Sequence, residues 1–397
     1  MRIAYDLRPL QSDTAAPRGI GTYTRELAKA LQASGAELVL LKWKNAPFVL
    51  EENWIDNFKV IELPLFLRKA PFKYANFLKE RYFSSHIFRN LASCADIVHF
   101  PTTDITMSFP ATDIGIPKVL TVHDMMSYYQ PEDVFSGLKG IKFNVIKRAF
   151  RSSWADIEHA DHIAADSDFT KEFAEKYLRD RHCEWAEKIT SVLLGYSETF
   201  KPASADEKQR VKEKYGLREK YIFYLGGLAH NKNLDRLFAV AEKMRDELPV
   251  LAVAGPANNA YSQHLRTSFP NANIKWLGFA DNADLPALYS AARAFVFPSY
   301  MEGFGLPVLE AMACGTPVAC ANVSSVPEVC GECALQFDPY NVEEIAQALQ
   351  KLTSDEDLCR QLSAKGLERA RLMTWEQTAK NMLELYSSVI SHYKNRK

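Results

Sequence analysis

The chain has 397 residues, of which 47% are hydrophobic and 24% charged, and its formal net charge is −1. This length predicts two domains with full cores, the neutral balance argues against nucleic acid as the main partner, and no apolar run approaches the roughly 20 residues of a membrane-spanning helix. Seven cysteines favour reduced thiols over a disulfide framework, and because the first residues already predict a strand rather than a signal peptide, we expect a cytosolic protein.

Short apolar runs alternate with helical patterns through the first half of the chain, which is typical of repeated βαβ units. Unbroken apolar runs indicate parallel strands that are covered on both faces. The predicted strands of this half are Ile3–Asp6, Leu38–Trp43, Ile97–Phe100, Val119–Val122 and Ile163–Ala165.

A glycine-rich segment, Arg18 to Tyr23, precedes the first predicted helix and contains Gly19 and Gly21. It superficially matches a dinucleotide-binding fingerprint. The third glycine is missing, however, and the segment lies too far from the preceding strand. We therefore do not expect a dinucleotide site in this segment.

Two segments of the first half are rich in cations, residues 68–83 and 139–151. The first interleaves its cations with aromatic side chains, and the basic run of the second is free of acids. Basic amphipathic segments of this kind bind anionic lipid surfaces. A pair of solvated helices whose aromatic side chains face the core explains them equally well, so both interpretations stay open. If the lipid interpretation holds, we expect a lipid-linked sugar as acceptor.

Two histidines lie at the ends of predicted strands, His99 before Phe100-Pro101 and His123 in Thr121-Val122-His123-Asp124. Ligands of open parallel sheets bind beyond the carboxyl ends of the strands. We therefore predict His123, and with it Asp124, as site residues, although a strand-end histidine is often structural. His99 is the second candidate, because packing against the neighbouring strand also explains it.

The triplet Asp166-Ser167-Asp168 follows the last predicted strand of the first half and precedes a helix. Two carboxylates at this spacing can bind a metal ion. Ser167 or Asp168 as a helix N-cap explains the triplet without metal, and no second cluster of metal ligands accompanies it. We favour the cap and expect no metal site.

A polar stretch, Lys201 to Lys220, is predicted to be a linker, and a second βαβ series follows it. We thus expect two doubly wound Rossmann-like α/β domains, residues 1–200 and 201–374, that face each other across an active-site cleft. An amphipathic terminal helix is expected in residues 375–397. The predicted strands of the second half are Tyr221–Leu225, Val250–Ala254, Ile274–Leu277, Phe295–Phe297 and Val318–Ala321.

The first strand of the second half ends in Gly226-Gly227, and Lys232 lies at the start of the helix that follows. A lysine there can bind a phosphate and neutralise a departing nucleoside diphosphate. Taken alone, the motif fits a solvated lysine at a helix end equally well.

Residues 297–320 contain two glutamates, Glu302 and Glu310, on either side of a turn that opens a helix. Gly303 and Gly305 allow backbone amides to come close to a ligand, and a helix N-terminus attracts anions such as a diphosphate. Glu310 can accept hydrogen bonds from a pair of sugar hydroxyls. The alternative is a capping Glu302, an ordinary loop and a solvated Glu310, but an acid, two glycines, a proline and a second acid rarely coincide in this order.

This segment resembles the Glu-x7-Glu signature of the retaining GT-B glycosyltransferases of family 4, and matching features extend over nearly the whole chain. The resemblance implies an N-terminal acceptor domain, a C-terminal nucleotide-sugar domain and a terminal helix that crosses back to the N-terminal domain. The other major glycosyltransferase fold has a metal-binding Asp-x-Asp motif, which Asp166-Ser167-Asp168 also matches. That motif is therefore the alternative to the helix cap.

The resemblance also implies roles for individual residues. The catalytic residues would be Glu302, His123 and Lys232, and the acceptor would contact His123 and Asp124. Relatives often have arginines where this chain has Gly227 and Asn231, so we expect the diphosphate contacts to depend on Lys232 and backbone amides. The implied donor-binding residues are Gly19, Gly21, Gly226, Gly227, Lys232, Gly303, Phe304, Gly305, Leu306 and Glu310.

The implied reaction moves a sugar from a nucleoside diphosphate to a hydroxyl of a glycan or lipid-linked acceptor, without metal or cofactor. The run Asn322–Glu328 resembles bacterial transferases of O-antigen or exopolysaccharide assembly, and we favour mannose from GDP-mannose as donor. The protein would work in the cytoplasm or on the cytoplasmic face of the inner membrane. A UDP-sugar transferase, a nucleotide-sugar epimerase, a phosphorylase and an inactive sugar-nucleotide binding module remain the alternatives.

Overall fold

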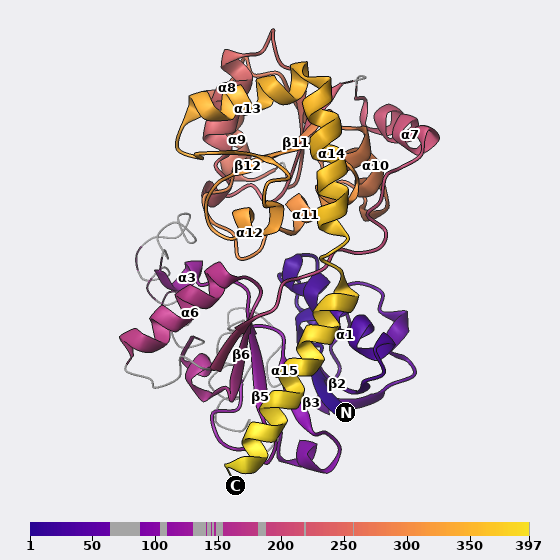
Figure 1. Cartoon of the computed structure of the whole chain (residues 1–397), viewed down its shortest axis with the longest axis vertical. Coiled ribbons are helices and arrows are strands. Elements are labelled where there is room, and N and C mark those ends of the chain that lie inside the picture. Colours follow the sequence, from indigo (N-terminus) through magenta and orange to yellow (C-terminus); the bar gives the residue numbers. More distant parts are fainter. Residues whose placement is uncertain are drawn as a thin grey trace. The chain divides into compact units, whose positions relative to one another are not determined.

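The computed structural model describes residues 1–63, 88–103, 109–129, 140, 144, 147, 154–181, 188–217, 220–256 and 258–396. The chain divides into two compact units, and each is built on one parallel sheet (Figure 1). The first unit combines Met1–Pro131 and Gly137–Gly195 with the C-terminal Trp375–Lys397, and the second consists mainly of Tyr196–Thr374.

The first unit has a seven-stranded sheet in the order β3-β2-β1-β4-β5-β6-β7. Strands β4 and β5 are buried at every residue, as expected for parallel strands covered on both faces. All five predicted strands are present, each within one residue of its expected bounds. Two edge strands, β3 and β7, were not predicted. The strands are β1 Arg2–Asp6, β2 Glu37–Trp43, β3 Lys59–Leu63, β4 Ile97–Phe100, β5 Lys118–Val122, β6 His162–Ala165 and β7 Ile189–Ser191.

The helices of the first unit bury amphipathic faces against its sheet and one another. Helix α15 packs on α1 although the two are far apart in the sequence (Figure 1), and Met382, Leu385 and Tyr386 are among its buried residues. The helices are α1 Gly19–Ala33, α3 Met126–Tyr129, α6 Asp168–Asp180 and α15 Trp375–Asn395, with 3-10 turns η1 Arg8–Gln11, η2 Asn53–Ile55, η3 Arg89–Ser93 and η4 Ala155–His159.

The second unit has a six-stranded sheet in the order β10-β9-β8-β11-β12-β13. The order reverses direction at β8, which is the doubly wound arrangement that the sequence predicts. The five predicted strands are present, and the edge strand β13 was missed. The strands are β8 Tyr221–Leu225, β9 Val250–Ala254, β10 Ile274–Gly278, β11 Ala294–Phe297, β12 Val318–Ala321 and β13 Leu335–Phe337.

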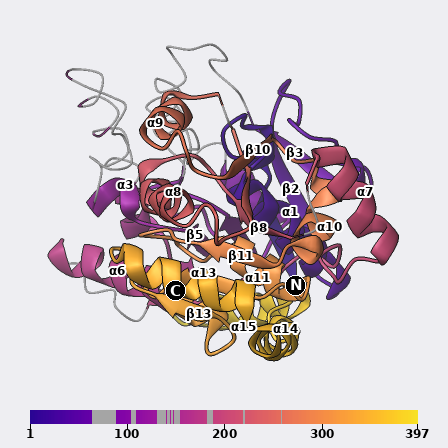
Figure 2. The ribbon, with the colours of Figure 1, turned by 90° about the horizontal axis from the view of Figure 1, so that it is seen from above.

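Helices surround the central strands β8 and β11 of this sheet (Figure 2). Helix α8 packs on α13, and α11 packs on α10, α12 and α14. The helices are α7 Ala205–Tyr215, α8 Leu234–Lys243, α9 Ala260–Ser268, α10 Leu285–Ala291, α11 Leu306–Ala313, α12 Val326–Cys330, α13 Val342–Ser354 and α14 Glu356–Ala370, with 3-10 turns η6 His230–Lys232 and η7 Asn282–Asp284.

The prediction of a linker between Lys201 and Lys220 is wrong for the residues that form α7. Ser204 and Glu207 form a capping box at the start of this helix, and Gly216 ends it in the left-handed conformation. Among the helical residues only Val211 is buried, because the charged side chains lie on a solvated face. A helix with so little apolar periodicity resembles a linker in sequence.

Candidate active site

The loop between β11 and α11 has the geometry of an anion-binding turn. Strand β11 is buried at every residue, and α11 begins at Leu306 with Pro307 in its first turn, as predicted. Gly305 has a φ of 109°, a conformation that a side chain would strain. Pro307 has no N–H group and the Val308 N–H donates to the Gly305 carbonyl at 2.9 Å, so it is the backbone amides before Pro307, together with the helix dipole, that can attract a phosphate.

Glu302 of this loop forms an ion pair with Lys232, which lies in the turn η6 between β8 and α8. The Lys232 Nζ lies 2.6 Å from Glu302 Oε1, and the two side chains are only 20% and 15% exposed. The structure thus brings together two residues that the sequence separates by seventy positions, both of them predicted as catalytic.

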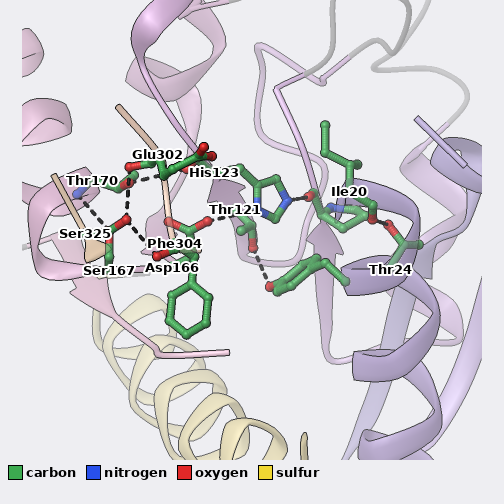
Figure 3. A network of polar contacts seen from close by, with 12 residues as sticks. Ile20, Thr24, Thr121, His123, Asp166, Ser167, Thr170, Glu302, Phe304 and Ser325 are labelled. Carbon is green, nitrogen blue, oxygen red and sulfur yellow. Dashed lines mark hydrogen bonds and ion pairs between the residues drawn. The ribbon is translucent and has the colours of Figure 1, made fainter. Parts of the chain in front are cut away.

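Two serines that sequence reasoning missed fix the backbone around Glu302. The Glu302 N–H donates to Ser324 Oγ at 3.2 Å. The Ser325 hydroxyl donates to the carbonyls of Glu302 at 3.0 Å and Phe304 at 2.8 Å (Figure 3). The only sequence signal was the Ser-Ser pair before Val326-Pro327, which marks a helix start.

A buried asparagine positions the segment that contains Lys232. Lys232 ends the turn η6, and Asn233 follows with a φ of 56°. The Asn233 amide donates to the carbonyls of Pro298 at 3.0 Å and Pro339 at 2.7 Å. Asn233 thereby ties the residues after β8, β11 and β13 together, and local sequence gives no sign of these long-range contacts.

Glu310 lies on α11, one turn further from the loop. The hydroxyl of Tyr289 donates to Glu310 Oε2 at 3.0 Å. Burial raises the pKa of Glu310 from 4.5 to about 7, because the charged carboxylate loses hydration. The ionised carboxylate lowers the stability of the fold in this place unless a ligand, such as a sugar with hydroxyl groups, supplies hydrogen bonds to it.

The glycines at the end of β8 differ in their surroundings. A Cβ on Gly226 would lie 2.7 Å from the hydroxyl of Tyr224, and that hydroxyl donates to the Gly227 carbonyl at 2.9 Å. A Cβ on Gly227 would meet no atom within 4 Å. Packing thus explains Gly226, while the position of Gly227 has room for a side chain.

In the first unit, both ring nitrogens of His123 face hydrogen-bond partners. Nε2 donates to the Pro101 carbonyl at 2.8 Å, and Nδ1 lies 3.3 Å from Asp166 Oδ2 (Figure 3). Because a carbonyl only accepts, Nε2 must have a proton. Burial raises the pKa of Asp166 to about 6. A sugar hydroxyl can bind a ring nitrogen of His123 only by replacing one of these partners.

The remaining predicted residues of this unit lie near His123 in the sequence or at the start of α1. Asp124 is exposed. Gly19 is exposed and has open space around it, whereas a Cβ on Gly21 would lie 2.1 Å from the Ala16 carbonyl oxygen. The tight turn before α1 therefore requires Gly21, and Gly19 is the glycine of the pair that solvent reaches.

His99 is a structural residue. It is fully buried and bonded to the hydroxyls of Tyr386 and Thr121, the second at 2.7 Å. Burial lowers the pKa of His99 to about 3, so the ring is uncharged at neutral pH. Its two bonds connect helix α15 to strand β5.

Ser167 is the N-cap of α6, because its side chain accepts from the Thr170 N–H at 3.0 Å. This confirms the predicted N-cap at Ser167. Within the described parts of the chain, no group of three or more His, Cys, Asp or Glu side chains could hold a metal ion.

Comparisons with known proteins identify the family. The family model described as "Glycosyltransferase Family 4" matches residues 17–185. The model described as "Glycosyl transferases group 1" matches residues 205–369. The chain belongs to the family 4 glycosyltransferases.

Curated relatives of this glycosyltransferase include mannosyltransferases. O-antigen chain mannosyltransferase B of Escherichia coli is 28% identical over 97% of this chain and 99% of that protein. The serotype-specific mannosyltransferase WbdA of Escherichia coli is 25% identical over 98% of this chain, which spans 48% of WbdA.

Solved structures show the same GT-B fold at low sequence identity. Sucrose-phosphate synthase from Thermosynechococcus elongatus has a TM-score of 0.72 at 21% identity, covering 99% of this chain and 100% of that one. Anabaena HepE in complex with UDP and glucose has a TM-score of 0.70 at 16% identity, covering 98% of this chain and 100% of that one. The predicted GT-B fold class is confirmed.

The predicted membrane contacts of this glycosyltransferase fall largely outside the described residues. Residues 68–83 lie outside them entirely, and only 140, 144 and 147 of the segment 139–151 lie inside. In the part of the chain that is described, no helix is both long and apolar enough to cross a membrane. Association with a lipid surface stays a prediction.

Proposed function

We propose that this glycosyltransferase moves mannose from GDP-mannose to a hydroxyl of a glycan or lipid-linked acceptor in bacterial surface polysaccharide assembly, with retention of the anomeric configuration. The ion pair of Lys232 and Glu302, at the turn that opens α11, is the observation on which the reaction type depends. The choice of mannose is supported by the likeness to O-antigen chain mannosyltransferase B along nearly the full length of both proteins.

The donor is proposed to bind the second unit. Its diphosphate would accept hydrogen bonds from the backbone amides of Gly303 to Leu306 and lie near the Lys232 ammonium. Both groups stabilise the negative charge that the diphosphate gains as the glycosyl bond breaks. Glu310 would accept hydrogen bonds from the ribose hydroxyls, so that the half-buried carboxylate gains partners for its charge.

The proposed step takes place on one face of the sugar. The bond between the anomeric carbon and the phosphate oxygen breaks, and its electron pair leaves with the diphosphate. The acceptor oxygen bonds to the same carbon, and its proton passes to a phosphate oxygen. The charges of Lys232 and the amides would suffice for this step without a metal ion.

Glu302 is assigned to sugar positioning and charge stabilisation rather than to covalent attack. Classical retention uses a free carboxylate as the nucleophile. The Glu302 carboxylate is instead paired with an ammonium at 2.6 Å, which lowers its nucleophilicity while leaving it able to stabilise positive charge on the sugar ring.

The acceptor is proposed to contact the first unit through Asp124 and the edge of His123. Asp124 is exposed, and its carboxylate can accept hydrogen bonds from sugar hydroxyls. Residues 68–83 and 139–151 would bring this unit to an anionic membrane, where a lipid-linked acceptor is found.

The second candidate function is an inactive sugar-nucleotide binding module. It is favoured by Gly227 and Asn231, which stand where relatives often have arginines. Binding and transfer distinguish the two functions, because only the transferase releases nucleoside diphosphate in the presence of an acceptor.

The experiment is a thermal stability measurement against GDP, UDP, ADP and their sugars, with magnesium or with chelator, followed by an assay for released diphosphate. We expect GDP and GDP-mannose each to raise the melting temperature, and chelator to leave the size of each shift unchanged. A shift with UDP species alone would change the donor, and a shift that requires magnesium would refute the metal-independent step.

A further inference from the structure

The second unit has an aromatic ring that is exposed but held in place. Tyr340, in the loop between β13 and α13, is 61% exposed. Its ring stacks on that of Tyr300 with 4.9 Å between centroids and 14° between planes. The Arg236 guanidinium lies 5.5 Å and 5.7 Å from the centroids of the Tyr300 and Tyr340 rings. We name these three residues the tyrosine platform.

Hydrogen bonds of the backbone make the platform rigid. The Tyr300 N–H donates to the Asn231 carbonyl at 2.9 Å, and the Tyr340 N–H donates to Asp338 Oδ1 at 2.9 Å. The buried Asn233 also bonds to the carbonyl of Pro339, directly before Tyr340. A ring fixed in this way loses little conformational entropy when a ligand binds.

The platform adjoins the ion pair that the proposed reaction uses. Tyr300 precedes Glu302 by two residues, and its backbone partner Asn231 directly precedes Lys232. The proposed diphosphate and ribose contacts lie on the other side of Glu302 in the sequence, at Gly303–Leu306 and Glu310. None of the donor contacts proposed above involves a residue of the platform, so the platform is available to bind something other than the nucleotide.

The chemistry of the platform fits a sugar ring. One face of Tyr340 packs on Tyr300, and the large exposed fraction leaves apolar ring surface for the C–H face of a pyranose. Hydroxyl groups at the rim of that pyranose can bond to the phenol oxygen and to the nearby Asp338 carboxylate. A single exposed ring is too small for a protein interface, but it matches one sugar unit.

We propose that the tyrosine platform is a subsite for a sugar unit of the oligosaccharide acceptor, located on the donor-binding unit. This inference rests on the proposed function, because it assigns a glycan as acceptor. It adds acceptor recognition to a unit whose other candidate residues are assigned to the donor.

The test measures manno-oligosaccharide binding and transfer by the full-length protein and its Tyr340→Ala and Tyr340→Phe variants. Loss of the ring should raise the KM for the oligosaccharide about tenfold, while kcat and the Kd for GDP stay within about twofold. Tyr340→Phe keeps the ring and should stay close to wild type. The matched control is Leu372→Ala, because Leu372 is 68% exposed and lies outside the platform.

A Tyr340→Trp variant reports contact directly, since a bound saccharide changes indole emission. Unchanged oligosaccharide KM in Tyr340→Ala, or no emission change in Tyr340→Trp on addition of saccharide, would overturn the proposal. So would a weaker Kd for GDP with unchanged saccharide binding, because the ring would then stack on the donor base. If the saccharide binds through Tyr340 but no donor is used, the subsite stands and the proposed function fails.

Discussion

Replacing Glu310 by glutamine should make the protein more stable at alkaline pH and a poorer binder of its donor. The pKa of Glu310 is raised from 4.5 to about 7 by burial. The folded protein therefore binds this proton more tightly than the unfolded chain does. The stabilisation from the protonated carboxyl is complete below pH 4.5 and is lost as the pH rises through about 7.

The magnitude follows from the two pKa values. At 1.36 kcal/mol per pH unit, ionisation of Glu310 costs about 3 kcal/mol of folding free energy at pH 8 but only about 1 kcal/mol at pH 5. A glutamine at this position avoids the cost and can still accept from the Tyr289 hydroxyl. Glu310→Gln should thus exceed wild type in stability by about 3 kcal/mol at pH 8 and by about 1 kcal/mol at pH 5.

The assay is urea denaturation of both proteins at the two pH values, with calorimetric titration of GDP. The lost charge should weaken GDP binding about tenfold, because hydrogen bonds to charged groups are the stronger ones. The control is Glu368→Gln, which changes an exposed glutamate on α14 and should alter stability by less than about 0.5 kcal/mol. The same stability difference at pH 5 and pH 8, or none, would refute the reasoning.

Three other predictions test the packing and the charges. Gly21→Ala should lower the melting temperature and reduce activity, because its Cβ would meet the Ala16 carbonyl oxygen at 2.1 Å. Gly19→Ala is the control and should have little effect, because a Cβ there has open space. Equal changes in the melting temperatures of the two variants would contradict this prediction. Arg8 forms a buried bidentate ion pair with Asp6. Arg8→Met should lower the free energy of unfolding, measured in urea, by about 3 to 5 kcal/mol, because it leaves the Asp6 carboxylate buried without its partner. An unchanged free energy of unfolding would show that the pair is dispensable. Lys232→Met should lower kcat/KM at least about a hundredfold through lost stabilisation of the leaving diphosphate, and a loss confined to stability would remove the residue from the mechanism.

The sequence predicted the central strands well, because strands buried on both faces have unbroken apolar runs. Of the edge strands, β10 was predicted, whereas β3, β7 and β13 were missed for the opposite reason. Strand β3 is mostly exposed, and β7 and β13 have three residues each. Helix α7 was mistaken for a linker because only Val211 of its residues is buried. Periodicity identifies elements only where burial imposes it.

The candidate site was predictable where its residues are close in the sequence. The turn of Gly303 to Gly305 and the start of α11 follow from local glycine and proline chemistry. The contacts of Ser325 and Asn233 join segments that are distant in the chain, so no local pattern reveals them. His99 and His123 both belong to strand ends, and only burial shows that His99 is structural.

The most direct test is nuclear magnetic resonance of the product formed from GDP-mannose and a manno-oligosaccharide acceptor in the presence of chelator. The account predicts an α-linked mannose, release of GDP, and a rate that falls at least about a hundredfold in Glu302→Gln, the isosteric variant of the paired carboxylate. A β-linked product, a requirement for a divalent metal, or full turnover by Glu302→Gln would contradict it.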